Sequence, residues 1–310
     1  MPSLRDIKRR MDTVRSTMQI TRTMEMVSTA KVQTALRHAE EAAPYRDAMT
    51  QILASVADAD TGRAHFPLLE EHPQVKHVVY VVIASDRGLA GGFNLQLQRY
   101  ALAEMSKLKR RGIASSVITC GKKPTEFFRY RKIEPVLSFE GISGEPTQEE
   151  AEEISSYLID AYTEGDVDRV ILCYQHAKNR VDQEMVVRQM LPISMEEIGL
   201  PNAPRADEAQ GVVTEHVSAA RRSVDFEFEP SAKEVLGYLL PRYVRTVIHH
   251  SLLDSAAAEH GARRRAMQSA TDNAREIITT LERTYNRVRQ GSITTEINEI
   301  VGGASALEES

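Results

Sequence analysis

The sequence is poor in several residue types. Its 310 residues include no tryptophan, only 5% aromatic residues and two cysteines, Cys120 and Cys173. Both cysteines end or lie within apolar runs typical of strands, which favours buried reduced thiols over a disulfide. No apolar run approaches the roughly 18 residues of a membrane-spanning helix. The N-terminus lacks the apolar core of a signal peptide. We therefore expect the chain to work in the cytoplasm or, through a partner, on the cytoplasmic face of a membrane.

An excess of one charge is also lacking. The net charge is only −5, which argues against a nucleic-acid-binding protein. The charges are unevenly placed, however. Residues 1–37 hold eight basic side chains against three acidic ones, and residues 263–289 hold seven arginines against three acidic side chains. We therefore expect an acidic middle between two basic ends. Basic helices on an acidic protein indicate an acidic partner surface, which can be protein, phosphate or lipid.

Patterns for metal binding and catalysis are scarce. The nine histidines show no HExxH motif and no Cys/His ligand spacing. The most enzyme-like stretch is SDRGLAGGFN (residues 85–94), since a glycine-rich turn between a strand and a helix can cradle phosphate with backbone N–H groups. Its glycines at 88, 91 and 92 fit neither the dinucleotide fingerprint nor the phosphate loop. A tight turn is favoured, and a nucleotide site remains the alternative.

The two ends of the chain have the spacing of a coiled coil. Residues 231–301 predict one long helix, with apolar or small residues at steps of three and four. These are Met267, Ala270, Ala274, Ile277, Leu281, Val288, Ile293, Ile297 and Ile300. The first 55 residues show the same steps in Leu4, Ile7, Met11, Val14 and Met18, after which the register shifts to Ile20, Met24 and Val27. About 70 helical residues would extend roughly 100 Å, so the two ends are expected to pair.

The region between the two ends has the pattern of an α/β domain. Strands are expected at residues 77–85, 115–120, 133–139 and 168–177, with a fifth at 181–193 that turns back along the sheet edge. Helices are expected at residues 94–111, 124–131 and 147–163. Residues 195–222 have the composition of a loop and 223–230 that of an edge strand. Because Pro241 interrupts the helical pattern, the regular part of the last helix is expected to start near it.

The predicted fold class is an α/β insert plus a long antiparallel two-helix coiled coil formed by the N- and C-terminal helices. The predicted domains are an N-terminal helix at residues 1–58 and a Rossmann-like α/β domain at 75–229. A C-terminal helix at 230–303, paired with 1–58, and a tail at 304–310 complete the chain.

Four motifs in order carry a resemblance. They are ITRTMEMVSTAKV (residues 20–32), SDRGLAGGFN, LLPRYV (239–244), and SATDNA (269–274) followed by TYNRVRQGSITTEINEIVGG (284–303). Together they resemble the gamma chain of the rotary ATP synthase over nearly the full length. The resemblance implies a non-catalytic central shaft of the bacterial type, with no cofactor of its own. Its partners would be three alpha and three beta chains, an epsilon chain and the ring of c subunits. The shaft would lie at the cytoplasmic side of the inner membrane, held there only through the complex.

The resemblance also implies contact residues. Arg289, Gln290 and Thr294 match polar contacts to a beta chain, Met24 and Arg263 match positions facing the beta-chain lever, and Ile297 begins the tip inside the ring. The chain departs from the family at four positions, namely Ala90, Arg264, Arg265 and Gly291. We expect Arg264 and Arg265 to strengthen docking to an acidic lever. We expect Gly291, which costs roughly 1 kcal/mol in a helix relative to alanine, to soften the shaft locally.

Two other functions are compatible with the residues. One is a nucleotide-binding α/β enzyme with a coiled-coil dimerisation arm, against which the glycine spacing counts. The other is a coiled-coil adaptor or nucleic-acid scaffold that uses the basic helices. The acidic middle and the lack of interleaved aromatic residues count against it.

Overall fold

The computed structural model describes residues 3–58, 66–179, 182–194, 229 and 231–308. The chain forms two compact units. The coil unit comprises residues 1–29 and 263–310, and the sheet unit comprises residues 30–262. Most of the predicted loop and edge strand at residues 195–230 lie outside the described residues. The predicted domain boundaries at 58, 75, 229 and 303 stay a prediction.

Two long helices begin and end the chain. Helix α1 spans Leu4–Asp58 and helix α6 spans Ala232–Glu308. Helix α1 starts with a capping box: the Ser3 hydroxyl accepts the Asp6 N–H at 3.2 Å, and the Asp6 carboxylate accepts the Ser3 N–H at 3.3 Å. These bonds satisfy backbone donors that a helix N-terminus leaves without partners, which fixes where α1 begins.

The prediction that the regular part of the last helix starts near Pro241 is wrong. Helix α6 begins at Ala232, nine residues before Pro241, and Ser231 caps it by accepting the N–H of Glu234 at 3.2 Å. A proline inside a helix costs about 3 kcal/mol because it removes a backbone hydrogen bond and crowds the preceding turn. Leu236, Leu240 and Val244 are all at most 2% exposed in this stretch. Burial of these side chains exceeds the cost of the proline, so the helix continues through it.

The middle of the chain forms one five-stranded sheet. Strands β1 (His77–Ile83), β2 (Ala114–Cys120), β3 (Leu137–Phe139), β4 (Arg169–Ala177) and β5 (Gln183–Leu191) lie in the order β3-β2-β1-β4-β5. The first four strands pair in parallel and β5 pairs antiparallel with β4 at the sheet edge. The predicted α/β class, its largely parallel sheet and the returning fifth strand are confirmed.

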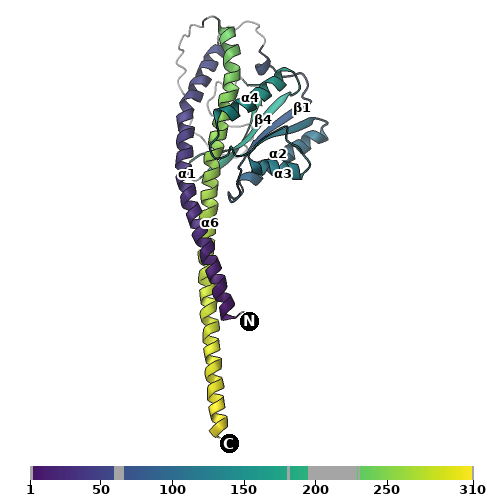
Figure 1. Ribbon diagram of the computed structural model, residues 1–310. Coiled ribbons are helices and arrows are strands. Elements are labelled where there is room, and N and C mark those ends of the chain that lie inside the picture. Colours follow the sequence, from purple (N-terminus) through teal and green to yellow (C-terminus); the bar gives the residue numbers. More distant parts are fainter. Residues whose placement is uncertain (1–2, 59–65, 180–181, 195–228, 230, 309–310) are drawn as a thin grey trace, which may run out of the picture. The chain divides into compact units, whose positions relative to one another are not determined.

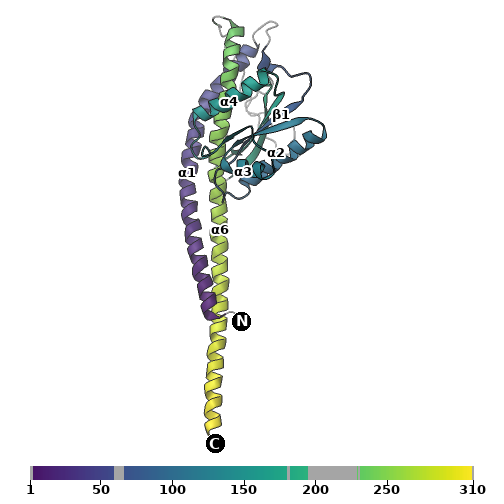
Figure 2. The same cartoon turned by 45° about the vertical axis from the view of Figure 1, so that its right-hand side comes forward.

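Both faces of the sheet are buried, which explains the continuous apolar sequence of β1. Val79, Val81 and Ile83 pack with helix α4 (Gln148–Thr163), the start of α6 and part of α1, together with the short 3-10 helix η1 (Pro67–Leu69). Val78 and Val82 pack with helices α2 (Phe93–Arg110) and α3 (Lys122–Tyr130). Figures 1 and 2 show α2 and α3 together on one side of the sheet and α4 on the other.

The two cysteines are free and buried, as the sequence indicated. Cys120 closes β2 and is fully buried, and Cys173 lies inside β4. Burial raises the pKa of the Cys120 thiol far above its ordinary value, because the thiolate loses its hydration. Both residues therefore act as small core side chains.

The acidic middle of the chain contains one basic layer. Residues 99–132, which run from α2 to just past α3, contain ten lysines and arginines against two glutamates. Nine of the ten basic side chains are exposed. Acidic residues elsewhere in the middle mask this layer when charge is summed over the whole segment.

Candidate functional site

The coil unit is an antiparallel helix pair with a narrow seam. Residues 4–29 of α1 run beside the part of α6 that starts at residue 263, and α6 continues past the beginning of α1 (Figures 1 and 2). Arg15 meets Glu282 at 2.9 Å, and Thr21 meets Thr271 at 2.8 Å. The Arg15–Glu282 pair is about half exposed, so it contributes at most about 1 kcal/mol and mainly sets register.

The residues in the seam between α1 and α6 differ in part from those that the apolar pattern predicted. In α1 buried or half-buried side chains recur at steps of four and three: Ile7, Met11, Val14, Met18, Thr21, Glu25 and Ser28. The predicted register shift to Ile20, Met24 and Val27 is wrong at Ile20 and Val27, which are 61% and 52% exposed, whereas Met24 is half-buried beside Glu25. In α6 the seam uses Thr271 and Ile278 in place of the expected Ala270 and Ile277. Polar residues occupy regular seam positions, and a search for apolar residues passes over them.

The Thr21–Thr271 contact gives a prediction for coil stability. Both hydroxyls are buried, and each also lies within hydrogen-bond distance of a backbone carbonyl of its own helix, Met18 or Met267. Thr21→Val is expected to cost about 1 kcal/mol because it removes one partner of a buried pair. Adding Thr271→Val should recover most of this loss. Thermal unfolding of the two single variants and the double variant, followed by circular dichroism, gives the coupling energy between Thr21 and Thr271. Losses of stability that simply add in the double variant would contradict the predicted coupling.

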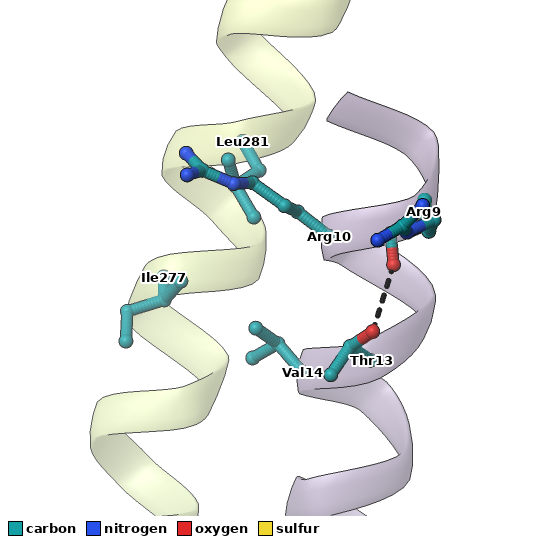
Figure 3. A pocket seen from close by; sticks show the side chains of 6 residues that line it. All are labelled: Arg9, Arg10, Thr13, Val14, Ile277 and Leu281. Atoms are coloured by element: carbon teal, nitrogen blue, oxygen red, sulfur yellow. Dashed lines mark hydrogen bonds between the residues drawn. The ribbon is translucent and has the colours of Figure 1, made fainter. Parts of the chain in front are cut away.

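A shallow groove of about 370 Å³ opens on the coil unit near the start of α1. Figure 3 shows Arg10 reaching across to α6 beside Leu281, with Ile277 on the same wall and Val14 facing it from α1. Thr13 donates its hydroxyl to the Arg9 carbonyl at 3.0 Å, as the dashed line marks. Apolar walls below two arginines are suited to an apolar side chain flanked by a carboxylate.

The final part of α6 has no neighbouring helix in the coil unit. Every residue from Arg289 to Val301 is exposed, including Ile293 at 46%, Ile297 at 53% and Ile300 at 67%. Isoleucines at this spacing on an exposed helix form an apolar stripe that no other described residue covers. An exposed stripe of this kind marks an interaction surface.

The predicted contact residues fall into two groups. Arg289, Gln290, Thr294 and Ile297 all lie on the exposed end of α6, where Thr294 donates its hydroxyl to the Gln290 carbonyl at 2.9 Å. The other group is less exposed: Met24 and Arg264 are half-buried, Arg263 is 7% exposed, and Arg265 is exposed. The three arginines each make an interaction within the chain. Their role in docking remains a prediction.

The glycine-rich turn is organised by Asp86. Its carboxylate accepts backbone N–H groups from Lys122 at 2.8 Å, Gly141 at 2.8 Å and Ser143 at 3.0 Å. Burial alone would raise the pKa of Asp86, but these donors outweigh it and hold the pKa below its ordinary value. The donors come from the loops after β2 and β3, at the sheet edge where α/β proteins bind phosphates. A side-chain carboxylate thus takes N–H groups that a phosphate site would need.

Asp254 joins α6 to the sheet within the sheet unit. It is 4% exposed and accepts the Ala177 N–H at 3.0 Å, and it lies 2.6 Å from Nδ1 of His176. Hydrogen bonding to Asp254 raises the pKa of His176 although burial opposes it. Nearby, Nε2 of His250 lies 2.8 Å from Arg46 of α1. Burial, and then the Arg46 charge, lower the pKa of His250 to about 4 despite the nearby carboxylates Asp254 and Asp47.

His250 therefore predicts a loss of stability in mild acid. The unfolded chain binds a proton near pH 6.5 and the folded chain does not, so stability is complete above that pH and falls as the pH drops toward 4. Between pH 7.5 and 5 the loss should be on the order of 2 kcal/mol. His176 acts in the opposite sense, since its stabilisation is complete below pH 6.5 and is lost as the pH rises through its raised pKa.

His250→Gln separates the two histidines. Glutamine keeps an acceptor for Arg46 but does not titrate, so the variant should lose about 2 kcal/mol less than the wild type between pH 7.5 and 5. Urea unfolding at both pH values measures the difference. Equal losses in the two proteins would show that His250 is not the sensitive group. His176→Gln should leave the acid loss at least as large.

Two kinds of feature are absent from the described residues. They contain no group of three or more His, Cys, Asp and Glu side chains that could hold a metal ion. Among the same residues, no helix is both long and apolar enough to cross a membrane.

Comparisons with known proteins agree with one another. The ATP synthase family model matches residues 3–307. The chain is 39% identical over 303 residues to the ATP synthase gamma chain of Xanthomonas campestris pv. campestris (strain B100), covering 98% of this chain and 99% of the relative. It is 38% identical over 307 residues to that of Stenotrophomonas maltophilia (strain K279a), covering 99% and 100%.

Solved structures show the same fold at lower identity. A chain of the Euglena gracilis mitochondrial ATP synthase, in the assembly described as OSCP/F1/c-ring, matches with a TM-score of 0.63 and 16% identity, covering 98% of this chain and 94% of that one. A chain of the Tetrahymena thermophila mitochondrial ATP synthase, described as central stalk and c-ring, matches with a TM-score of 0.55 and 22% identity, covering 81% and 99%. With the family model and the bacterial relatives extending over almost the whole sequence, the chain belongs to the ATP synthase gamma chain family.

Proposed function

We propose that this chain is the central rotary shaft of an ATP synthase. The shaft would turn with a membrane ring of c subunits as ions flow through it, and its turning would bias three beta chains through binding, formation and release of ATP. Hydrolysis would drive the same cycle in reverse. The chain itself would be non-catalytic and bind no cofactor, with catalysis on the beta chains.

The observation that carries this proposal is the bare end of α6. An apolar stripe from Ile293 to Ile300 on an exposed helix needs a surrounding surface, and a ring of six chains around the helix would supply one. A shaft that biases conformational equilibria needs different contacts in different states and requires no catalytic residue. The Asp86 bonds that fill the glycine-rich turn also count against a nucleotide site there.

The proposed partners are three alpha and three beta chains around the coil unit, with an epsilon chain and the c ring elsewhere on the complex. We propose that the chain is peripheral on the cytoplasmic side of the inner membrane and held there through the complex. Nucleic acid is not among the proposed partners. Met24 and Arg263 would face the beta-chain lever. Arg289, Gln290 and Thr294 would make polar contacts to a beta chain, and Ile297 would enter the tip of the ring.

Native mass spectrometry of the tagged chain, purified from its own cells at low salt, tests the proposal. The expected particle holds one copy of this chain with three copies each of two larger nucleotide-binding chains. A lone monomer or dimer that carries its own nucleotide would refute the shaft role. It would support the alternative of an α/β enzyme with a coiled-coil arm.

The arginine cluster gives a functional prediction. Replacing Arg264 and Arg265 together, as Arg264→Met/Arg265→Val, should reduce the coupling of ATP hydrolysis to ion pumping by roughly two- to fivefold, since charge contacts at a docking surface set its strength and salt dependence. The control is Arg275→Met on the same helix, whose charge pairs with Asp272 at 2.8 Å on the surface. The number of ions pumped per ATP hydrolysed in membrane vesicles measures coupling. Equal coupling in the double variant and in Arg275→Met would refute a docking role for Arg264 and Arg265.

A further inference from the structure

The basic layer of the sheet unit contains a groove of about 460 Å³ between α2 and α3. Its walls combine apolar and charged side chains. Leu95 is 42% exposed and Tyr130 is 86% exposed, although both are large side chains that usually prefer burial. The complete lining is Gly91, Asn94, Leu95, Gln98, Lys123, Glu126, Phe127, Tyr130 and Arg131.

Gln98 adds an uncharged polar group to the groove wall. The residue is only 5% exposed, but its amide is not among the fully enclosed polar atoms that lack a hydrogen-bond partner in the described part of the chain. An amide in the lining of a groove can exchange water for a hydrogen bond to a molecule that occupies the groove.

Arg131 is held in place at the groove wall. Its guanidinium carbon lies 3.6 Å from the centroid of the Phe127 ring, and it donates to the Phe127 carbonyl at 3.2 Å. Within the described residues neither Arg131 nor the adjacent exposed Lys132 forms an ion pair. A guanidinium fixed by stacking keeps further N–H donors in the planar arrangement that recognises a carboxylate.

We propose that this groove docks an acidic segment of a partner polypeptide. The segment would place a backbone amide on Gln98, an apolar side chain against Leu95 and Tyr130, and a carboxylate on Arg131. Two features favour a polypeptide over a lipid or a free phosphate. The Gln98 amide offers both a donor and an acceptor, which match a peptide group, whereas a phosphate offers chiefly acceptors. The exposed Leu95 and Tyr130 add an apolar contact that a free phosphate cannot make.

This groove lies in the sheet unit. The docking proposed for it is separate from the shaft role, which rests on the coil unit. The ten basic side chains of residues 99–132 would attract an acidic segment before contact, and the groove would then select one segment among many acidic ones. Binding is therefore expected to weaken with salt but to depend on groove residues more than on the layer's total charge.

Photocrosslinking in the host cell tests the docking. Tyr130→p-benzoylphenylalanine is encoded in the full-length chain, cells are irradiated, and cross-linked peptides are identified by mass spectrometry after purification through a tag on this chain. The expected result is one dominant polypeptide segment rich in Asp and Glu. Combining Arg131→Glu with Lys132→Glu should lower the yield about tenfold, and Gln98→Met, which keeps the side-chain volume, about fivefold.

A matched control separates the groove from general attraction. Lys109→Glu with Arg110→Glu makes the same charge change at the C-terminal end of α2, outside the groove, and should lower the yield less than about twofold. Cross-links to lipid alone, cross-links spread over many proteins, no cross-link, or an equal loss in the control would each overturn the proposal. ATPase activity of the same membranes reports assembly, so failure of docking is distinguishable from failure of the shaft role.

Discussion

Replacing Gly121 with alanine is expected to destabilise the sheet unit by more than about 4 kcal/mol. Gly121 precedes α3 with a φ of +110°, a conformation that residues with a side chain rarely adopt. A Cβ atom there would lie 2.5 Å from the Ala84 carbonyl oxygen and 2.9 Å from its carbon. Backbone hydrogen bonds from Ala84 to Cys120 and from Gly121 to Phe139 fix both sides of the clash, so neither side can withdraw easily.

A second glycine separates the two causes of the destabilisation in Gly121→Ala, which are backbone strain and the collision of the Cβ atom. Gly112 also has a positive φ, of +73°, but a Cβ there would meet nothing within 4 Å. Gly112→Ala should therefore cost only about 1–2 kcal/mol, the strain alone. Calorimetric unfolding should show a fall in melting temperature of about 10 °C for Gly121→Ala and only a few degrees for Gly112→Ala. Equal shifts would mean that the collision is relieved by movement.

Removing the Asp86 carboxylate is expected to have the next largest effect, about 3 kcal/mol for Asp86→Ala. The substitution leaves the N–H groups of Lys122, Gly141 and Ser143 without their acceptor. Urea unfolding measures the loss, and hydrogen exchange should become faster at these three amides. Asp86→Asn keeps one carbonyl oxygen and should fall between the wild type and Asp86→Ala.

The pH dependence provides a second test of Asp86. Its pKa in the folded chain lies below the ordinary value of 3.8, so its stabilisation is complete above that pH and is lost as the pH falls through the lowered pKa. The difference between the wild type and Asp86→Ala should therefore shrink only in strong acid. Glu145→Ala, which removes an exposed carboxylate two residues after Ser143, should change stability by less than about 0.5 kcal/mol.

Local patterns were sufficient to predict most of the elements. The continuous apolar run of β1 indicated a strand, and the steps of three and four from Leu4 to Met18 indicated the first long helix. Each of these signals depends on residues close together in the sequence. The prediction at Pro241 failed because burial of neighbouring side chains offsets the cost of the proline, and the sequence does not show which side chains are buried.

The site residues that were missed depend on distant parts of the chain. Asp86 is defined by loops that lie more than 30 residues away, and Gln98 by its place in the lining of the groove between α2 and α3. Thr21 and Thr271 were passed over because a hydrophobic pattern cannot detect polar side chains in a seam. The contact residues from Met24 to Ile297 came from the family resemblance, and only experiments on the complex test them.

The unbroken seven-residue spacing in α1 has a mechanical consequence. An α-helix has about 3.6 residues per turn, so a strict repeat of seven winds a helix pair into a left-handed supercoil. A supercoil has a hand, and twisting it one way tightens the winding while twisting it the other way opens it. We therefore expect the coil unit to resist torque differently in the two directions, and the hydroxyl pair at Thr21 and Thr271 lies in the seam that unwinding would disturb.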